Sequence, residues 1–284
     1  MKLKKLLISI CAVLWMQPLA ASTERIVTAD GSLTEIVYLL GAENKLAGVD
    51  TTSNFPEEAS KLPQIGYKRA ISVEGVLSLT PDLLLVTEDS GPPKSLNQLK
   101  QTGLDIKTFS SAPNLEAVKE KIIGVAETLG KQEEGEALWQ KVKRKVEASK
   151  AKSKTITQPV KVMFVLSMSE KSPIVAGHNT HAESIIKMAG GINAVEGLQG
   201  YKPISPEAVA LANPDVILMM ARREHSTPAE ELFSKPGFML TNAAANQHLI
   251  SMDGMYLLGF GPRIGDAIEE LSQRLYPQQI TAQK

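Results

Sequence analysis

The chain has 284 residues, of which 43% are hydrophobic, with 31 basic and 31 acidic side chains. This length can bury a substantial core and suits two modest domains better than one. The balanced charge gives no electrostatic reason to bind nucleic acid or an anionic membrane surface. The single cysteine excludes a disulfide within the chain and a cluster of thiolate metal ligands.

The first residues are typical of a secretory signal peptide. Three lysines precede an apolar run over 6–15, and small residues at 20–22 suit cleavage. We expect residues 1–21 to be removed on export, which also removes Cys11 and leaves 28 basic side chains, three fewer than 31, against 31 acidic ones. An uncleaved membrane anchor is the alternative, but the apolar run is short for a bilayer span.

After this segment, short apolar runs alternate with helical segments. Strands are expected near 25–28, 46–49, 82–86 and 106–109, and helices near 33–40, from Ser72 onward, and near 95–102. The run at 82–86 is continuously apolar, as expected of a strand buried on both faces of a parallel sheet. This alternation predicts an α/β layer architecture for an N-terminal lobe at 22–112.

Residues 113–154 interrupt the alternation and predict a connecting helical segment. Its second helix, expected over 132–152, is rich in Lys, Glu and Gln. At about 1.5 Å per residue it would span on the order of 30 Å, so it could be a rigid strut between two lobes. A charge-rich helix can also be only a solvated face. A C-terminal lobe is expected over 155–284, opening with a strand at 160–166.

A repeat relates the two expected lobes. The stretch from Ser72 to Asp82 recurs 133 residues later, pairing Ser-x-Glu with Ser-x-Glu and Pro-Asp with Pro-Asp. Tyr67 has a counterpart in Tyr201, whereas Arg69 has none, because Lys202 is followed directly by proline. The sequence therefore predicts two Rossmann-like α/β lobes joined by a long rigid helix, with an asymmetric ligand cleft between the lobes.

Enzyme motifs are mostly absent from the sequence. It contains no G-x-S-x-G elbow, no Walker loop and no H-E-x-x-H motif. His178 and His181 could lie on one face of a helix and bind zinc, but such a site needs a third ligand. A secreted metal-dependent hydrolase that uses this pair, and an adhesion module without a ligand, are the alternatives from other functional classes.

The loop around Tyr67 suggests a different chemistry. Tyrosinate is an anionic oxygen ligand that can bind ferric haem iron. Its ordinary pKa is near 10, so a nearby cation must favour the phenolate, and Arg69 lies two residues away. Arg69 could instead bind a haem propionate in bidentate fashion. The alternative is that Tyr67 only packs in a turn.

Glu74 and Glu207 are the second paired feature. Each lies two residues after a serine that is placed to cap a helix, and acids in a first helical turn stabilise the helix dipole without any partner. Helix stability alone does not require both halves to keep an acid at the same position.

The repeat, the connecting helix and the export signal together resemble the helical-backbone class of periplasmic substrate-binding proteins of ABC transporters. Within this class, the segments Gly66-Tyr67-Lys68-Arg69 and 257–263, with its Gly-Phe-Gly-Pro-Arg sequence, look like those of periplasmic haem (haemin)-binding proteins. Siderophore and corrinoid binders of the same class are the alternative.

This resemblance implies a haem b ligand with Tyr67 as its axial iron ligand and Arg69 in contact with haem or its propionates. Tyr201 is then a haem-contact candidate across the cleft. Some relatives carry a histidine ligand near the end of the second lobe's first strand, where this chain has Met168. Met168 could bind the iron or only pack, and His178 in a nearby loop could replace the missing histidine. Five-coordinate iron and the binding of one or two haems are equally compatible with these residues.

The resemblance also implies partners. Family members dock on an inner-membrane ABC permease, which works with its ATPase, through one acid on each lobe, and the matching residues are Glu74 and Glu207. An outer-membrane haem receptor would act upstream. We accordingly expect a monomeric periplasmic protein that has no catalytic step and no nucleic-acid partner.

Overall fold

The computed structural model describes residues 25–153, 156–168, 172–221 and 228–277. The expected signal peptide at 1–21, including Cys11, lies outside the described residues. Within the described ranges, no helix is both long enough and apolar enough to cross a membrane.

The N-terminal lobe is built on a parallel four-stranded sheet with the strand order β2-β1-β3-β4. Its strands are β1 (Ile26–Ala29), β2 (Leu46–Val49), β3 (Leu83–Thr87) and β4 (Asp105–Phe109). Its helices are α1 (Gly31–Leu39), α2 (Val73–Ser78) and α3 (Pro93–Gln101), with short 3₁₀ turns at Glu43–Lys45 and Glu57–Lys61. All five residues of β3 are buried, which confirms a strand covered on both faces.

The C-terminal lobe has a mixed sheet with the strand order β10-β9-β5-β6-β8. Its strands are β5 (Lys161–Met168), β6 (Pro173–Ala176), β7 (Ile192–Asn193), β8 (Tyr201–Pro203), β9 (Val216–Ala221) and β10 (Leu249–Asp253). Its helices are α6 (His181–Met188), α7 (Pro206–Ala212), α8 (Ala229–Phe233), α9 (Asn242–Ala245), α10 (Gly254–Leu258) and α11 (Ile264–Leu275), with a 3₁₀ turn at Phe238–Leu240. Strands β6 and β8 pair antiparallel, so Tyr201 lies in a strand rather than in a copy of the Tyr67 loop.

The repeat performs the same structural task in both lobes. Asp82 accepts a hydrogen bond from the backbone N–H of Arg25 over 2.8 Å, and Asp215 accepts one from Lys161 N–H over 2.9 Å. Each aspartate thereby ties the first strand of its lobe to the strand that follows the Pro-Asp pair. Two residues before each aspartate the backbone is left-handed, with φ of 43° and 41°. The two halves thus share a backbone conformation as well as a sequence pattern.

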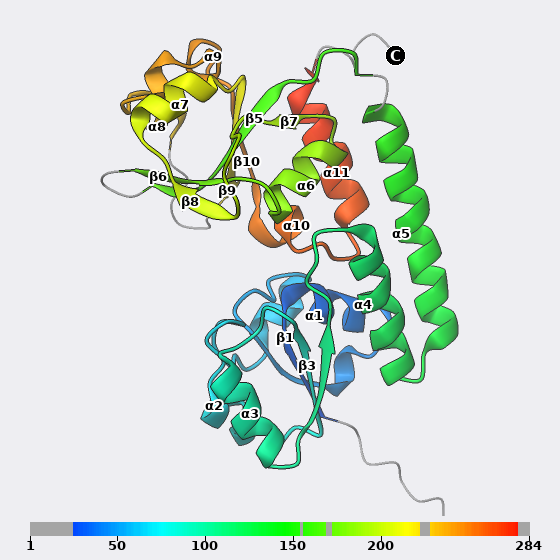
Figure 1. Cartoon of the computed structure of the whole chain (residues 1–284). Coiled ribbons are helices and arrows are strands. Elements are labelled where there is room, and N and C mark those ends of the chain that lie inside the picture. Colours follow the sequence, from blue (N-terminus) through cyan, green and yellow to red (C-terminus); the bar gives the residue numbers. More distant parts are fainter. Residues whose placement is uncertain (1–24, 154–155, 169–171, 222–227, 278–284) are drawn as a thin grey trace, which may run out of the picture.

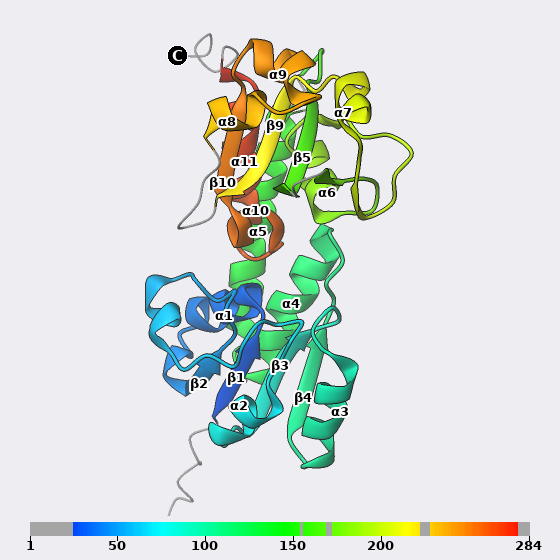
Figure 2. The ribbon, with the colours of Figure 1, turned by 90° about the vertical axis from the view of Figure 1, so that its left-hand side faces the viewer.

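Two antiparallel helices connect the lobes, α4 (Leu115–Thr128) and α5 (Gln132–Ser153). Helix α5 has 22 residues, or about 33 Å at 1.5 Å per residue, and it runs along both lobes (Figures 1 and 2). It packs between α4 and α11, and one hydrophobic core continues from the N-terminal sheet through these helices to the C-terminal sheet. The fold is therefore the expected α/β arrangement of two lobes on a helical backbone. The assignment of residues 113–154 as the segment that connects the lobes stays a proposal.

Candidate ligand-binding site

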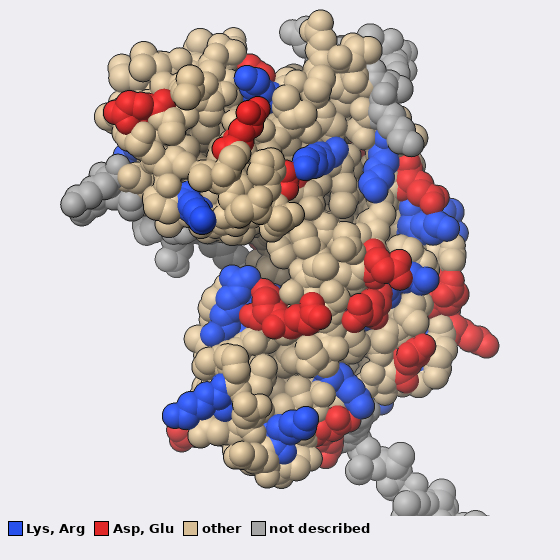
Figure 3. Space-filling view, viewed as in Figure 1, with Lys and Arg blue, Asp and Glu red and all other residues tan. Residues whose placement is uncertain are grey.

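A cavity lies between the lobes, where the carboxyl ends of the parallel strands of both sheets meet. Its walls include residues from the loops that follow β1, β2 and β3, and residues at the ends of β9 and β10. Open α/β sheets bind ligands at this edge. The cavity volume is about 520 Å³, within the range of small-molecule sites. Figure 3 shows the surface hollowed between the two lobes.

Tyr67 lies on an irregular segment that is fixed to the loops after two strands. The Gly66 carbonyl accepts from Thr51 N–H over 3.0 Å, and the Lys68 carbonyl accepts from Gly91 N–H over 2.8 Å. Gly66 has a φ of +94°, a left-handed conformation that favours glycine. These contacts fix the point at which the Tyr67 side chain leaves the backbone toward the cavity.

Tyr67 is 43% exposed, and a cation lies at its phenol oxygen. Arg69 Nη1 donates to Tyr67 Oη over 3.2 Å, while Arg69 Nη2 pairs with the Asp89 carboxylate at 2.6 Å. Burial alone would raise the pKa of Asp89, but Lys68 and Arg69 hold that pKa well below its usual range. Asp89 therefore stays anionic and anchors the guanidinium beside the phenol.

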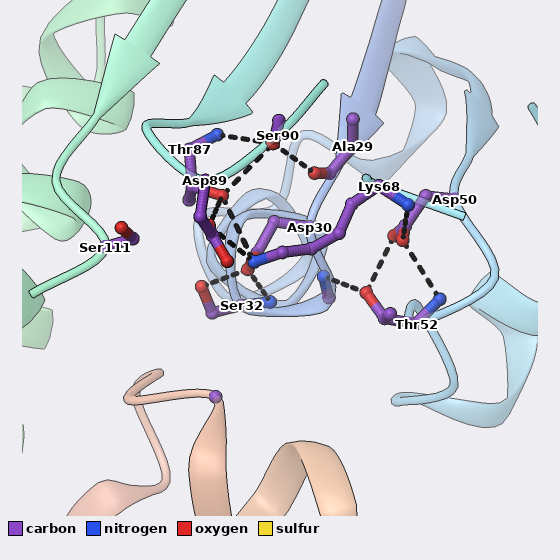
Figure 4. A network of polar contacts seen from close by, with 12 residues as sticks. Ala29, Asp30, Ser32, Asp50, Thr52, Lys68, Thr87, Asp89, Ser90 and Ser111 are labelled. Atoms are coloured by element: carbon purple, nitrogen blue, oxygen red, sulfur yellow. Dashed lines mark hydrogen bonds and ion pairs between the residues drawn. The ribbon is translucent and has the colours of Figure 1, made fainter. Parts of the chain in front are cut away.

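Lys68 joins two carboxylates that follow neighbouring strands (Figure 4). Its ammonium lies 2.6 Å from Asp30, which follows β1, and 2.9 Å from Asp89, which follows β3. Burial would raise the pKa of Asp30, but the attraction of Lys68 and Lys121 lowers it. Asp30 also caps helix α1 by accepting from Ser32 N–H over 2.8 Å. The carboxyl edge of the N-terminal sheet is thus a rigid polar wall.

The opposite wall comes from the C-terminal lobe. Tyr201 and His181 both line the cavity. Tyr201 packs edge to face on Phe164 with ring centroids 6.2 Å apart, and burial raises its pKa, so the neutral phenol is favoured. His181 packs edge to face on Phe260 at 5.3 Å. Burial, together with repulsion from Lys121, lowers the pKa of His181, so its imidazole is neutral near pH 7.

The other two predicted ligand residues lie elsewhere. Met168 ends β5, opposite Pro173 of β6, and packs with the hydrophobic cluster on the outer side of the sheet. His178 Nδ1 lies 2.7 Å from Glu183, and its side chain is 41% exposed. Neither residue lines the cavity, whereas Tyr67, Arg69 and Tyr201 do.

His178 and His181 also do not lie together as the zinc-binding alternative would require. One faces Glu183 and the other faces the cavity. Within the described part of the chain, no group of three or more His, Cys, Asp or Glu side chains is placed to hold a metal ion. The hydrolase alternative therefore gains no support from the described residues.

The segment Leu257 to Arg263 forms the seam between the lobes. A Cβ atom added to Gly261 would lie 3.1 Å from Ser32 of the N-terminal lobe, so the backbone approaches α1 closely here. Arg263 Nε donates to both carboxylate oxygens of Glu35 at 3.0 Å, and its guanidinium lies 3.7 Å from the Phe55 ring centroid. This segment holds one lobe against the other.

Sequence reasoning missed Lys121, which lines the cavity from α4 and is only 2% exposed. A signal was present in the sequence. Val118, Ile122 and Val125 define the buried stripe of α4, and Lys121 falls inside this stripe, where an apolar residue is expected. A lysine at such a position indicates a buried charge with a structural or functional role.

A family model described as "Periplasmic binding protein" matches residues 26–256, and the chain therefore belongs to this family. The family consists of substrate-binding proteins that act outside the cytoplasm with an ABC permease and its ATPase. The substrate-binding lipoprotein YvrC of Bacillus subtilis is 27% identical over 257 residues, or 89% of this chain and 80% of that protein.

Two further similarities bear on the ligand. The vitamin B12-binding protein of Vibrio campbellii is 31% identical over 196 residues, covering 68% of this chain and 70% of that protein. The structure of the periplasmic heme-binding protein RhuT from Roseiflexus sp. RS-1, in apo form, is 38% identical with a TM-score of 0.86, covering 89% of this chain and 98% of that one. Other similar structures are also of periplasmic haem-binding proteins.

Proposed function

We propose that this protein binds haem in the cleft between its lobes, in the periplasm, and delivers it to an inner-membrane ABC importer without a catalytic step of its own. The observation that carries this proposal is the Tyr67 phenol at the cavity wall, with the Arg69 guanidinium at its oxygen. Haem binders among the structural relatives support it, while the B12-binding relative makes a corrinoid the alternative.

In this proposal, Tyr67 binds the haem iron as phenolate. Arg69 donates a hydrogen bond to the phenol oxygen, and Asp89 keeps the guanidinium in place. Apolar side chains of the C-terminal lobe that line the cavity, Leu166 and Met220, offer the porphyrin a surface with little desolvation cost. Tyr201 covers the ligand from the second lobe.

The proposal is tested by titrating the mature chain with haemin and, in parallel, with cyanocobalamin and a ferric siderophore. We expect haemin to give a shifted Soret band that saturates at micromolar concentration, and the other two ligands to show no saturable binding in equilibrium dialysis. Saturable binding of cobalamin or the siderophore with a flat haemin titration would contradict the haem assignment.

We further propose that Glu74 and Glu207 dock the protein on its permease. Both side chains are exposed, in the first turns of α2 and α7. These helices lie on different lobes and on the side of the molecule away from α5 (Figure 1). Each carries an exposed leucine as well, Leu77 at 37% and Leu211 at 88% exposure, as expected of a protein-binding surface.

The combined replacement Glu74→Ala and Glu207→Ala is expected to abolish stimulation of the transporter ATPase in proteoliposomes, while haemin affinity stays within about twofold, because both acids lie outside the cavity. Glu116→Ala with Glu230→Ala is the matched control, since these exposed acids also lie in first helical turns, one on α4 and one on the C-terminal lobe. Full stimulation by the Glu74 and Glu207 double variant would refute the docking assignment.

A further inference from the structure

Lys121 is a buried cation where the two lobes meet at the cavity. Its Nζ donates to Ser32 Oγ of the N-terminal lobe over 3.0 Å and to the Gly259 carbonyl of the C-terminal lobe over 3.2 Å. An ammonium has three N–H donors, and these two bonds use two of them. Because Lys121 also lines the cavity, the third donor is available to a ligand there.

Lys121 has no anionic partner within the described residues. No carboxylate lies within 4.0 Å of its Nζ, whereas Lys68 and Arg69 each form ion pairs. Ser32 Oγ links Lys121 to a carboxylate, because it accepts from Lys121 Nζ and donates to Asp30 over 2.5 Å. Burial lowers the pKa of Lys121, and attraction to Asp30 only partly opposes this effect.

One hydrogen-bonded network connects Lys121 to the proposed iron ligand. From Tyr67 it passes in order through Arg69, Asp89, Lys68, Asp30 and Ser32 to Lys121. This path contains three cations and two carboxylates, and Asp50 joins it by accepting from Lys68 N–H over 3.2 Å. Of the three cations, Lys121 is the one that forms no ion pair with a carboxylate of the path. A buried cation of this kind is costly unless an anion is supplied.

We propose that Lys121 binds a carboxylate of the cleft ligand, at a site distinct from the iron site at Tyr67. The inference rests on the proposed function, because haem combines an iron centre with propionate carboxylates on one ring. A carboxylate at Lys121 would contact a residue that bridges both lobes, so ligand binding and lobe contact are coupled at this point. Tyr67 would recognise the metal, and Lys121 would recognise the acid.

The test compares haemin with its dimethyl ester, which keeps the iron and the ring but has no carboxylate charge. Both are titrated by the Soret band into the wild-type chain, Lys121→Met and Lys119→Met. Met has a similar length without charge, and Lys119 is the control because it lies on the same helix but does not line the cavity. The wild type and Lys119→Met should bind haemin roughly tenfold or more tighter than the ester.

Lys121→Met should lose this preference and bind both ligands with the affinity of the wild type for the ester. Its Soret maximum should stay in the wild-type position, because Tyr67 is intact. An unchanged preference in Lys121→Met would overturn the inference, and so would equal weakening of both ligands. A wild-type chain without any haemin Soret band would overturn the proposed function and this inference together.

Discussion

Tyr67→Phe is expected to remove most of the haemin affinity and to shift the Soret band, because the phenolate oxygen that binds iron is gone. Changes that only reorient a metal ligand cost about 10–100-fold in affinity, so loss of the ligand itself should exceed this range. The ring that packs at the cavity wall is kept in this variant, which separates coordination from packing. Titration with haemin, followed by absorbance, measures both the affinity and the coordination.

Tyr201→Phe is the matched control on the opposite wall. Because burial favours the neutral phenol of Tyr201, loss of this hydroxyl should leave the Soret position unchanged and reduce affinity only modestly. If Tyr67→Phe retained the wild-type spectrum and affinity, or if Tyr201→Phe produced the larger spectral change, the assignment of the iron ligand would be refuted.

Arg263→Ala is expected to lower the free energy of unfolding by about 3 kcal/mol. Removing one partner of a buried ion pair leaves the other charge buried and unpaired, which usually costs about 3–5 kcal/mol. We expect the lower end of this range because the Arg263 side chain is a quarter exposed, while that of Glu35 is 6% exposed. Burial already raises the pKa of Glu35, despite Arg263, and loss of the guanidinium raises it further. Denaturant unfolding measures the effect.

The loss of unfolding free energy in Arg263→Ala should depend on pH. A carboxyl group whose folded pKa exceeds its unfolded value costs stability as the pH rises through that interval, so this loss should be larger at about pH 8 than at about pH 5. Arg263→Met combined with Glu35→Gln removes both charges and should recover most of the loss. Arg274→Ala, which breaks a pair between exposed side chains, should cost less than about 1 kcal/mol. Equal costs for the two arginines would contradict the seam assignment.

Most of the fold could be predicted from the repeat and the apolar runs. Ser72 and Ser205 cap α2 and α7 as expected, each accepting a backbone N–H three residues later. The strands β6 and β8 were not predicted, because they are only four and three residues long and pair antiparallel within an otherwise parallel pattern. Short segments of this kind acquire their structure from the neighbouring sheet rather than from local sequence preference.

The candidate site could be predicted only in part. Tyr67, Arg69 and Tyr201 reach one cavity, as the loop pattern and the repeat suggested. Met168 was selected because it stands where some relatives carry a histidine ligand, and His178 because it lies in a nearby loop. Side-chain direction alternates along a strand and changes through a loop, so neither position decides which residue faces the cleft. Lys121 lies on a different element, and its contact with the second lobe depends on how the lobes pack.

A crystal structure of the haemin complex would test the central claim most directly. The account predicts haem in the cavity between the lobes, with its iron bonded to Tyr67 Oη, Arg69 still at that oxygen, and Tyr201 against the ring from the second lobe. Iron bonded through His181 without Tyr67, or haem bound outside the cleft, would contradict it.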